Sequence, residues 1–144
     1  MFSKTCQYAI QAVLFISIRS EDNRPVGLKE IVESQDVPLH FLSKILQDLV
    51  KRGILNSNKG PTGGFSFRTS PKKLKLMDVV EVVDGTDFFK KCGIGLKHCS
   101  DSSPCPVHGE YQKIRAGMEE LLTSRSIFDL ATDVKNGEAI VSFR

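Results

Sequence analysis

The sequence contains no apolar run close to the ~20 residues that a helix needs to cross a bilayer. Its opening, MFSKTCQYAIQAVLFISIRS, has an apolar centre, but Gln7 and Gln11 interrupt it and no small-residue cleavage site follows before Arg19. We therefore expect neither a signal peptide nor contact with a membrane. The expected location is the cytoplasm, where thiols stay reduced unless they bind a metal or carry out redox chemistry.

The residue patterns of the common enzyme classes are also missing. The sequence has no cofactor-binding motif, no Ser/His/Asp arrangement and no paired carboxylates suited to acid–base chemistry. It has no internal repeat and no low-complexity tract either. A redox enzyme that uses a metal cluster for electron transfer is therefore a weak interpretation, and a binding protein is favoured.

At 144 residues the chain suits one domain, or one domain with an appended helix. With 40% hydrophobic and 26% charged residues its composition is that of an ordinary globular protein, and the net charge of +3 alone indicates no class of partner. The basic residues are unevenly spread, however. Between Lys44 and Lys75 lysine and arginine are frequent, and Asp48 is the single acid. Such a stretch is usually a solvated face, and it indicates nucleic-acid binding only where a DNA-reading fold lies beneath it.

Apolar residues recur at helical spacing through the first third of the chain. Residues 3–20 are predicted to form a helix with Ser3 as its N-cap, and residues 28–34 a shorter one. The sequence QDVP then predicts a tight turn, and Pro38 is expected to open the next helix, which runs to about Arg52. The apolar stripe of that helix consists of Leu42, Ile45, Leu46, Leu49 and Val50.

Shorter elements follow. The sequence ILNSNKGPTGGFSFRTS predicts two short strands, residues 54–55 and 65–68, joined by a tip rich in glycine and proline. Residues 76–84 are predicted to form a short strand that leads into a helix. Residues 106–124 make the longest predicted helix, and residues 126–134 a short last one. The expected fold class is mainly α with a small β-hairpin.

The order of these elements suggests a unit that reads DNA. A short helix, a tight turn and a second amphipathic helix form a helix–turn–helix, whose second helix enters the major groove. The residues expected to meet the bases there are Leu39, His40, Ser43 and Lys44. The hairpin has the composition of a wing, because its glycine-rich tip lets the backbone approach phosphates that Lys59 and Arg68 can neutralise. Helix–turn–helix geometry also occurs without DNA binding, but basic charge on both helix and hairpin favours that function.

A second motif lies in the segment CGIGLKHCSDSSPCPVH. It has the pattern C-x6-C-x5-C-x2-H, formed by Cys92, Cys99, Cys105 and His108. A disulfide is disfavoured, because the compartment is reducing and an odd cysteine would remain. Structural zinc stays possible, since Cys3His is a standard ligand set, although the usual close C-x2–4-C pairing is missing. An iron–sulfur cluster held by thiolates and one imidazole is the other possibility. His98 is interpreted as a solvated side chain.

Both motifs together resemble the family of bacterial winged-helix regulators typified by the iron–sulfur cluster regulator IscR and the nitric-oxide-sensing repressor NsrR. The resemblance covers nearly the full length and rests on SKTCQYAI, FLSKILQDLVKRGIL, the wing KGPTGGF and the cysteine segment after DVVEVVDG. It implies a homodimer in which the helix over residues 106–124 is the dimerisation element. It also implies cluster ligation by the three loop cysteines, and the IscR branch adds a histidine that matches His108.

The chain departs from the family pattern at several positions. Lys59 stands where the wing usually carries arginine, which keeps the charge but not the planar fork. The first cysteine gap is one residue longer than in the IscR branch, and the N-terminal helix offers no acid of the kind that the NsrR branch uses as a ligand. The resemblance therefore implies a 2Fe–2S rather than a 4Fe–4S cluster. Cys6 is interpreted as a core thiol, with a role as ligand from the second subunit as the alternative.

The expected organisation has three parts: a winged helix–turn–helix DNA-binding domain over residues 1–84, a cluster-binding loop over 85–105, and a dimerisation helix with a C-terminal segment over 106–144. The expected function is a transcription regulator, binding pseudo-palindromic promoter DNA under control of an iron–sulfur cluster. The alternative is a cluster-free or zinc-binding regulator that responds to a partner protein or to thiol metabolism. The expected DNA contacts are Lys4, Leu39, His40, Ser43, Lys44, Lys59, Thr62 and Arg68. The sequence does not indicate the target genes, or whether they are activated or repressed.

Overall fold

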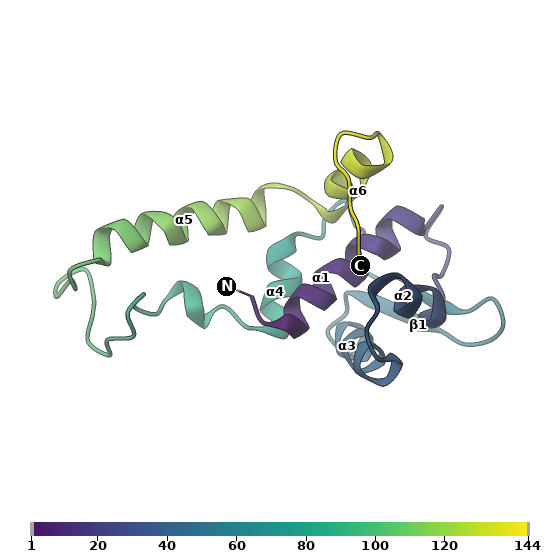
Figure 1. Ribbon diagram of the computed structural model, residues 1–144, viewed down its shortest axis with the longest axis horizontal. Coiled ribbons are helices and arrows are strands. Elements are labelled where there is room, and N and C mark those ends of the chain that lie inside the picture. The colour runs from purple at the N-terminus through teal and green to yellow at the C-terminus, as the bar shows by residue number, and fades with distance from the viewer. Residues whose placement is uncertain (1, 144) are drawn as a thin grey trace.

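The computed structural model describes residues 2–143 of the chain, which form a mainly helical molecule with one two-stranded antiparallel hairpin (Figure 1). This architecture confirms the predicted fold class. In chain order the elements are α1 (Lys4–Arg19), α2 (Leu28–Gln35), α3 (Leu39–Lys51), β1 (Leu55–Asn58), β2 (Gly64–Phe67), α4 (Leu76–Val83), the 3-10 helix η1 (Asp87–Phe89), α5 (His108–Ser124) and α6 (Ile127–Lys135).

Helix α1 lies at the centre of the fold and packs against α2, α3, α4 and α6. It begins as predicted, because the Ser3 hydroxyl accepts a hydrogen bond from the Cys6 backbone N–H at 3.0 Å. The carboxylate of Asp84, at the end of α4, accepts a hydrogen bond from the Ser3 backbone N–H at 2.9 Å. The start of α1 is thereby tied to the end of α4.

Helices α2 and α3 form the predicted helix–turn–helix. The turn between them is possible because Asp36 adopts the left-handed conformation at φ +52°, which aspartate tolerates better than most residues. Pro38 lies one position earlier than expected: it is the N-cap of α3, and its carbonyl accepts hydrogen bonds from the N–H groups of Phe41 and Leu42. The predicted stripe on α3 is buried at Leu42, Ile45, Leu46 and Leu49.

The hairpin pairs Leu55 with Phe67 at its base. Its first strand is longer than the predicted 54–55 and runs to Asn58. The backbone of Phe65 also exchanges two hydrogen bonds, of 2.8 and 2.9 Å, with Val26. At Gly64, which has φ +143°, a side-chain carbon would lie 2.2 Å from the Val26 carbonyl oxygen. Only glycine fits this close approach of two backbones, which fixes the hairpin to the segment before α2.

The C-terminal half differs from expectation at two places. Residues 76–84 contain no strand, because α4 is helical from Leu76 onward. Helix α5 begins at His108 rather than at residue 106, after a turn closed by the His108 N–H and the Cys105 carbonyl. The predicted last helix is confirmed as α6, which packs on α1. Within residues 2–143 no helix is long and apolar enough to cross a membrane.

Helix α5 extends away from the packed helices and carries the cysteine loop at its outer end (Figure 1). It is joined to the body through a small cluster of four buried side chains, namely Cys6, Val80, Phe89 and Leu122, separate from the main core. Because these residues come from α1, α4, η1 and α5, the cluster connects the half of the chain that contains the helix–turn–helix to the long helix.

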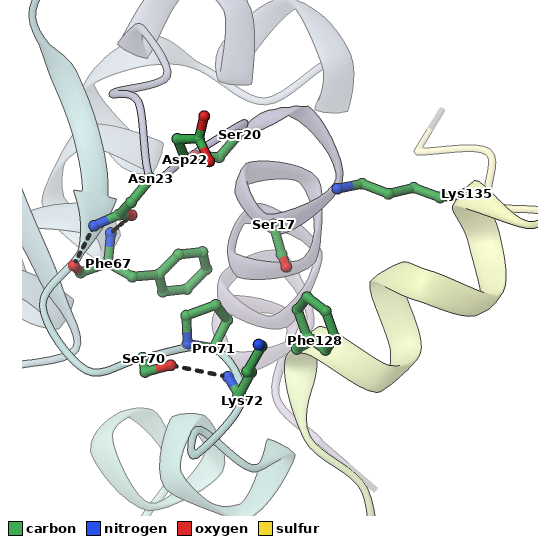
Figure 2. Close-up of a pocket in the computed structure, with 10 residues that line it drawn as sticks. All are labelled: Ser17, Ser20, Asp22, Asn23, Phe67, Ser70, Pro71, Lys72, Phe128 and Lys135. Atoms are coloured by element: carbon green, nitrogen blue, oxygen red, sulfur yellow. Dashed lines mark hydrogen bonds between the residues drawn. The ribbon is translucent and has the colours of Figure 1, made fainter.

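An open cavity lies at the C-terminal end of α1, between the segment that follows β2 and helix α6 (Figure 2). At its edge the Asn23 side chain donates to the Phe67 carbonyl at 2.9 Å and accepts from the Phe67 N–H at 2.8 Å. Lys72 lies with its ammonium 5.0 Å from the centre of the Phe128 ring. These contacts tie the end of the hairpin to the loop after α1, and the segment after β2 to the start of α6.

Candidate functional site

The start of α3 presents the side chains that are predicted to read DNA. Leu39 is 53% exposed, His40 and Lys44 are exposed, and Ser43 is half-buried. These four side chains alternate along α3 with the buried residues Leu42 and Ile45. One face of the helix therefore packs in the core, and the other is accessible to solvent.

The remaining predicted DNA contacts come from other elements. Lys59 and Thr62 are exposed at the tip of the hairpin, and Arg68 is exposed directly after β2. Lys4 is exposed in the first turn of α1, one helical turn before Tyr8. The Tyr8 ring meets the Phe41 ring of α3 edge-on at 6.0 Å, which directs this face of α1 toward the start of α3.

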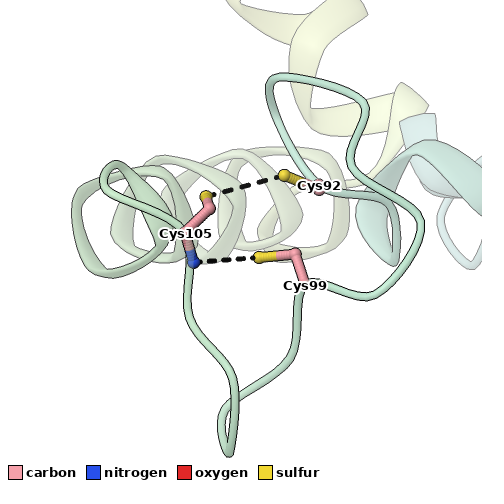
Figure 3. A group of neighbouring side chains, drawn as sticks. All are labelled: Cys92, Cys99 and Cys105. Atoms are coloured by element: carbon pink, nitrogen blue, oxygen red, sulfur yellow. Dashed lines mark hydrogen bonds between the residues drawn. The ribbon is translucent and has the colours of Figure 1, made fainter.

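The cysteine loop brings three thiols together at the N-terminal end of α5, which is the end that lies away from the packed helices. The Sγ atoms of Cys92, Cys99 and Cys105 all lie within 4.8 Å of one another and face a common point (Figure 3). The Sγ atoms of Cys92 and Cys105 are 3.6 Å apart, and all three cysteines are free thiols. The Cys105 backbone N–H also donates to Cys99 Sγ at 3.4 Å.

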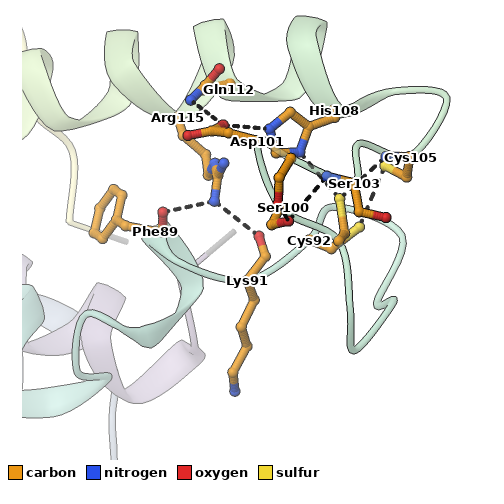
Figure 4. Close-up of polar contacts among 12 residues, drawn as sticks. Phe89, Lys91, Cys92, Ser100, Asp101, Ser103, Cys105, His108, Gln112 and Arg115 are labelled. Atoms are coloured by element: carbon orange, nitrogen blue, oxygen red, sulfur yellow. Dashed lines mark hydrogen bonds and ion pairs between the residues drawn. The ribbon is translucent and has the colours of Figure 1, made fainter.

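His108 joins this group through Cys99. Its Nδ1 atom lies 3.1 Å from Cys99 Sγ, and its Nε2 atom lies 2.9 Å from the Asp101 carboxylate (Figure 4). The side chain is only 14% exposed, and Gln112 donates to the same carboxylate at 3.4 Å. All four predicted ligands are therefore near one another, whereas His98 is exposed, as its interpretation as a solvated side chain requires.

The surroundings of the thiols alter their acidity. Hydrogen bonds from the backbone N–H groups of Leu96 and Ile94 lower the pKa of Cys92 to about 7. At Cys99 the hydrogen bond from the Cys105 backbone lowers the pKa, but burial and the neighbouring thiols outweigh it, and the net direction is upward. One thiol of the group is thus readily ionised near neutral pH, as ligation of a metal requires.

Residues of α5 that sequence reasoning missed hold the loop in place. Arg115 donates to the carbonyls of Phe89 at 2.9 Å and Lys91 at 3.1 Å, just before the first cysteine (Figure 4). The backbone at Gly93 lies against the Tyr111 ring, so that a side-chain carbon there would be 2.8 Å from ring atoms. Both contacts come from the helix face that carries His108, and the spacing of these residues along a predicted helix is the signal that could have revealed them.

Cys6 lies elsewhere. It is fully buried in the small cluster between α1 and α4, and burial raises the pKa of its thiol to about 12. Its surroundings match the interpretation as a core thiol. An enclosed, protonated thiol is a poor candidate for a ligand to a site on another subunit.

The outer face of α5 carries large apolar side chains without cover. Ile114 is 59% exposed and Leu121 64% exposed, whereas Leu122, on the adjoining face, is buried. Two such residues two turns apart on an otherwise polar helix form an apolar ridge, which we define by Ile114 and Leu121.

Comparison with known proteins agrees with this geometry. The profile of the Rrf2 family, described as an iron-dependent transcriptional regulator, matches residues 2–133. A protein of Aquifex aeolicus assigned as an HTH-type transcriptional regulator is 30% identical over 132 residues, which cover 90% of each chain. The HTH-type transcriptional regulator IscR of Vibrio parahaemolyticus is 28% identical over 127 residues, covering 88% of this chain and 74% of its own.

Solved structures show the same fold at lower identity. CymR, the global cysteine regulator of B. subtilis, superposes with a TM-score of 0.78 at 20% identity, covering 92% of this chain and 96% of its own. IscR of T. potens superposes with a TM-score of 0.73 at 22% identity, covering 99% of this chain and 94% of its own.

Proposed function

Since the chain belongs to the Rrf2 family of transcriptional regulators, we propose that it binds promoter DNA as a homodimer and that an iron–sulfur cluster modulates this binding. The observation that carries the proposal is the convergence of Cys92, Cys99, Cys105 and His108 at the base of α5, in a fold that exposes a DNA-reading helix. The named relatives are regulators and not enzymes, in keeping with a binding function.

The donor set fits such a cluster chemically. Thiolates are the usual ligands of iron–sulfur centres, and imidazole can replace one or more of them. The group is half-buried, and backbone N–H groups point at two of the sulfur atoms. Three thiolates and one imidazole favour the 2Fe–2S form. When bound, the cluster supplies reversible electron transfer and a centre that oxidants can attack.

The DNA-binding half of the proposal follows from exposed charge and helix geometry. We assign base contacts to the side chains at the start of α3, namely Leu39, His40, Ser43 and Lys44. We assign phosphate contacts to Lys4, Lys44, Lys59, Thr62 and Arg68, which lie exposed on α1, on α3 and along the hairpin. Phosphate contacts position the protein on the duplex, and base contacts select the sequence.

The proposed dimer uses the apolar ridge of α5. Ile114 and Leu121 are exposed on one chain and would be covered by the same ridge of a second copy, as in a two-fold symmetric interface. Because α5 also carries His108 at its first position and Leu122 in the core, a change at the cysteine loop would alter how the two reading heads are spaced. A coupling free energy of only ~1–3 kcal/mol between the cysteine loop and the DNA-binding surface would suffice to switch the affinity for DNA.

A cluster-free regulator that responds to thiol metabolism is the second candidate. It is favoured by the close structural match to CymR, whose name describes a cysteine regulator, although at 20% identity that match shows the fold alone. Three thiols within 4.8 Å of one another, with the His108 imidazole beside Cys99, favour the metal-dependent form instead.

The proposal is tested by selecting duplexes from a random library with protein purified without oxygen. We expect enrichment of a pseudo-palindrome whose half-sites are centred about one helical turn apart or a multiple of it. Leu121→Glu, which places a charge on the ridge, should yield a monomer that enriches a single half-site. Ile140→Glu is the control, because Ile140 is 96% exposed in the C-terminal segment. Failure to enrich any sequence would contradict the regulator function.

A further inference from the structure

We propose that the open cavity at the C-terminal end of α1 binds a small organic carboxylate with an apolar body, of the class that phenylacetate represents. The cavity has a volume of about 320 Å³, within the range of about 300–1,000 Å³ that is usual for ligand sites. It is lined by α1, the loop after α1, the segment after β2 and α6, and so is separate from the cysteine loop and from the start of α3. The inference is carried by a buried hydroxyl and an unpaired ammonium group that meet apolar surface inside it.

The hydroxyl belongs to Ser17, in the last turn of α1. Ser17 is only 6% exposed, and its oxygen points into the cavity toward Lys72 and Phe128 (Figure 2). Within residues 2–143 this hydroxyl has no hydrogen-bond partner. It is therefore free to donate to an oxygen atom of a molecule that fills the cavity.

The ammonium group belongs to Lys72, in the segment after the hairpin. It lies 5.0 Å from the centre of the Phe128 ring, and no carboxylate of residues 2–143 pairs with it or with Lys135, the second lysine of the lining. A ring face attracts an ammonium group but does not neutralise its charge. Phe128 also lies in the first turn of α6, where the aligned peptide dipoles favour a negative charge. A carboxylate beside Lys72 would therefore be attracted by a full charge, a hydroxyl donor and a helix end.

The rest of the lining favours an apolar body on the ligand. The rings of Phe67, Pro71 and Phe128 face the cavity, and Phe67 is buried (Figure 2). The single acid of the lining, Asp22, lies at the opposite end from Lys72 (Figure 2). Inorganic phosphate would leave the rings without contact, and a cation would be repelled by Lys72. The lining therefore fits a monocarboxylate that carries a ring or a branched chain.

A bound carboxylate would also contact the base of the hairpin. Asn23 lines the cavity and forms two hydrogen bonds with the backbone of Phe67, the last residue of β2. A molecule packed against both residues would stabilise this pair and thereby hold the hairpin in place. Arg68, an assigned phosphate contact, is the next residue. The consequence for DNA binding rests on the proposed function, whereas the binding site does not.

The test titrates phenylacetate into the full chain, labelled with ¹⁵N, and follows the backbone amide signals by NMR. We expect saturable binding of one molecule per chain, with the largest shifts at Ser17, Ser70, Lys72 and Phe128. Phenylacetamide, which keeps the ring but lacks the charge, should bind about tenfold more weakly or less. Acetate, which keeps the charge but lacks the ring, should bind more weakly by about the same factor. Shifts scattered over the surface, or equal affinity for phenylacetate and phenylacetamide, would overturn the proposal.

Hydrogen exchange in the same samples tests the link to the hairpin. The Phe67 backbone N–H donates to the Asn23 side chain at 2.8 Å, so its exchange with solvent reports on this pair. We expect slower exchange of this amide in protein saturated with phenylacetate. An unchanged rate would refute the link between the cavity and the hairpin.

Variants separate the site from general attraction by charge. Lys72→Gln should weaken phenylacetate binding about tenfold or more, because it removes the charged donor, and Ser17→Ala should weaken it about tenfold. Lys72→Arg keeps the charge and should retain most of the affinity. Lys73→Gln is the matched control, since Lys73 is exposed at the next position and lies outside the cavity lining, and it should change nothing. Equal weakening by Lys72→Gln and Lys73→Gln would rule out the site.

The outcome is independent of the proposed function. Protein that binds phenylacetate in the cavity but selects no DNA sequence would support this site and contradict the regulator function. Protein that selects a duplex but fails to bind phenylacetate would overturn the site and leave the regulator function standing. Circular dichroism of each variant shows whether a loss of binding comes from loss of the fold.

Discussion

Individual side chains on the proposed DNA surface have different surroundings and so are expected to have different effects. Lys59 is exposed at the tip of the hairpin, on a long flexible side chain that can reach a phosphate. Ser43 is half-buried in the first turns of α3, on a helix whose opposite face is fixed in the core. A mobile charge suits sequence-independent attraction, whereas a short hydroxyl on a rigid helix suits the reading of base edges.

We predict that Lys59→Ala weakens binding to all duplexes alike, because it removes one phosphate contact. The slope of log affinity against log salt should become shallower by about one unit. Ser43→Ala should instead lower the preference for the selected site by roughly 1–3 kcal/mol and leave the salt slope unchanged. Titrations of selected and scrambled duplexes at several salt concentrations measure both effects.

Lys135→Ala serves as the control for charge, since Lys135 is exposed on α6. It should change neither the slope nor the preference. The assignment of roles is reversed if Lys59→Ala alters sequence preference while Ser43→Ala alters only the dependence on salt.

Single residues also differ in how far the sequence alone predicts their roles. The proximity of the three thiols and His108 is predictable, because inert cysteines are normally buried and these lie at short spacing in a polar segment. Their role as ligands stays a prediction. Asp101 is not predictable, because an acid in a serine-rich loop has the composition of any turn. Its role depends on contacts with His108 and Gln112, which only the folded loop creates.

At the scale of elements, α5 is the helix that organises the site. His108, Tyr111 and Arg115 lie on one face of it and contact the loop, and the same face continues to Leu122 in the buried cluster. An adjoining face carries the apolar ridge. The loop is therefore docked along a rigid element and not merely attached to its end.

We predict that Gly93→Ala disturbs this docking. The added carbon would lie 2.8 Å from the Tyr111 ring, a distance at which one of the two groups must move, and Cys92 is the residue directly before Gly93. Uptake of iron and sulfide should fall. Removing the ring as well, in Gly93→Ala/Tyr111→Ala, should restore part of the uptake.

Gly109→Ala is the matched control, because Gly109 also neighbours a proposed ligand but its added carbon meets nothing within 4 Å. It should leave uptake unchanged and stabilise α5 by about 0.5–1 kcal/mol. Equal iron content in both single variants would show that the contact between Gly93 and Tyr111 does not position the loop.

The helices are largely predictable because their apolar faces repeat at helical spacing. The exception is α4, where the β-branched sequence VVEVV suggests a strand. There the Asp78 carboxylate accepts a hydrogen bond from the Lys75 backbone N–H at 2.8 Å, and Val79 and Val80 are buried. The hydrogen bond at the start of α4 and the burial of its valines outweigh the preference of β-branched residues for strands. The docking of the loop could not be predicted, because Arg115 and Phe89 are 26 positions apart and their contact exists only in the folded chain.

At the scale of the whole molecule, the structure joins the cysteine loop to the DNA-reading half by a short path. The loop is held by α5, α5 is anchored at Leu122 in the cluster with Cys6 and Val80, and α1 and α4 of that cluster pack directly against α3. A rigid path of this kind can transmit a change at the thiols to the spacing of the two reading helices in the proposed dimer.

The central claim is that the occupant of this loop controls DNA affinity, and one measurement tests it directly. The affinity of oxygen-free protein for its selected duplex is measured with the iron–sulfur cluster present and again after its removal from the same preparation. The account predicts a change of about 5- to 150-fold in the wild type. In Cys99→Ser, prepared in the same two ways, it predicts no change. Equal affinity of the wild type in both states, with the fold and the dimer intact, would contradict the account.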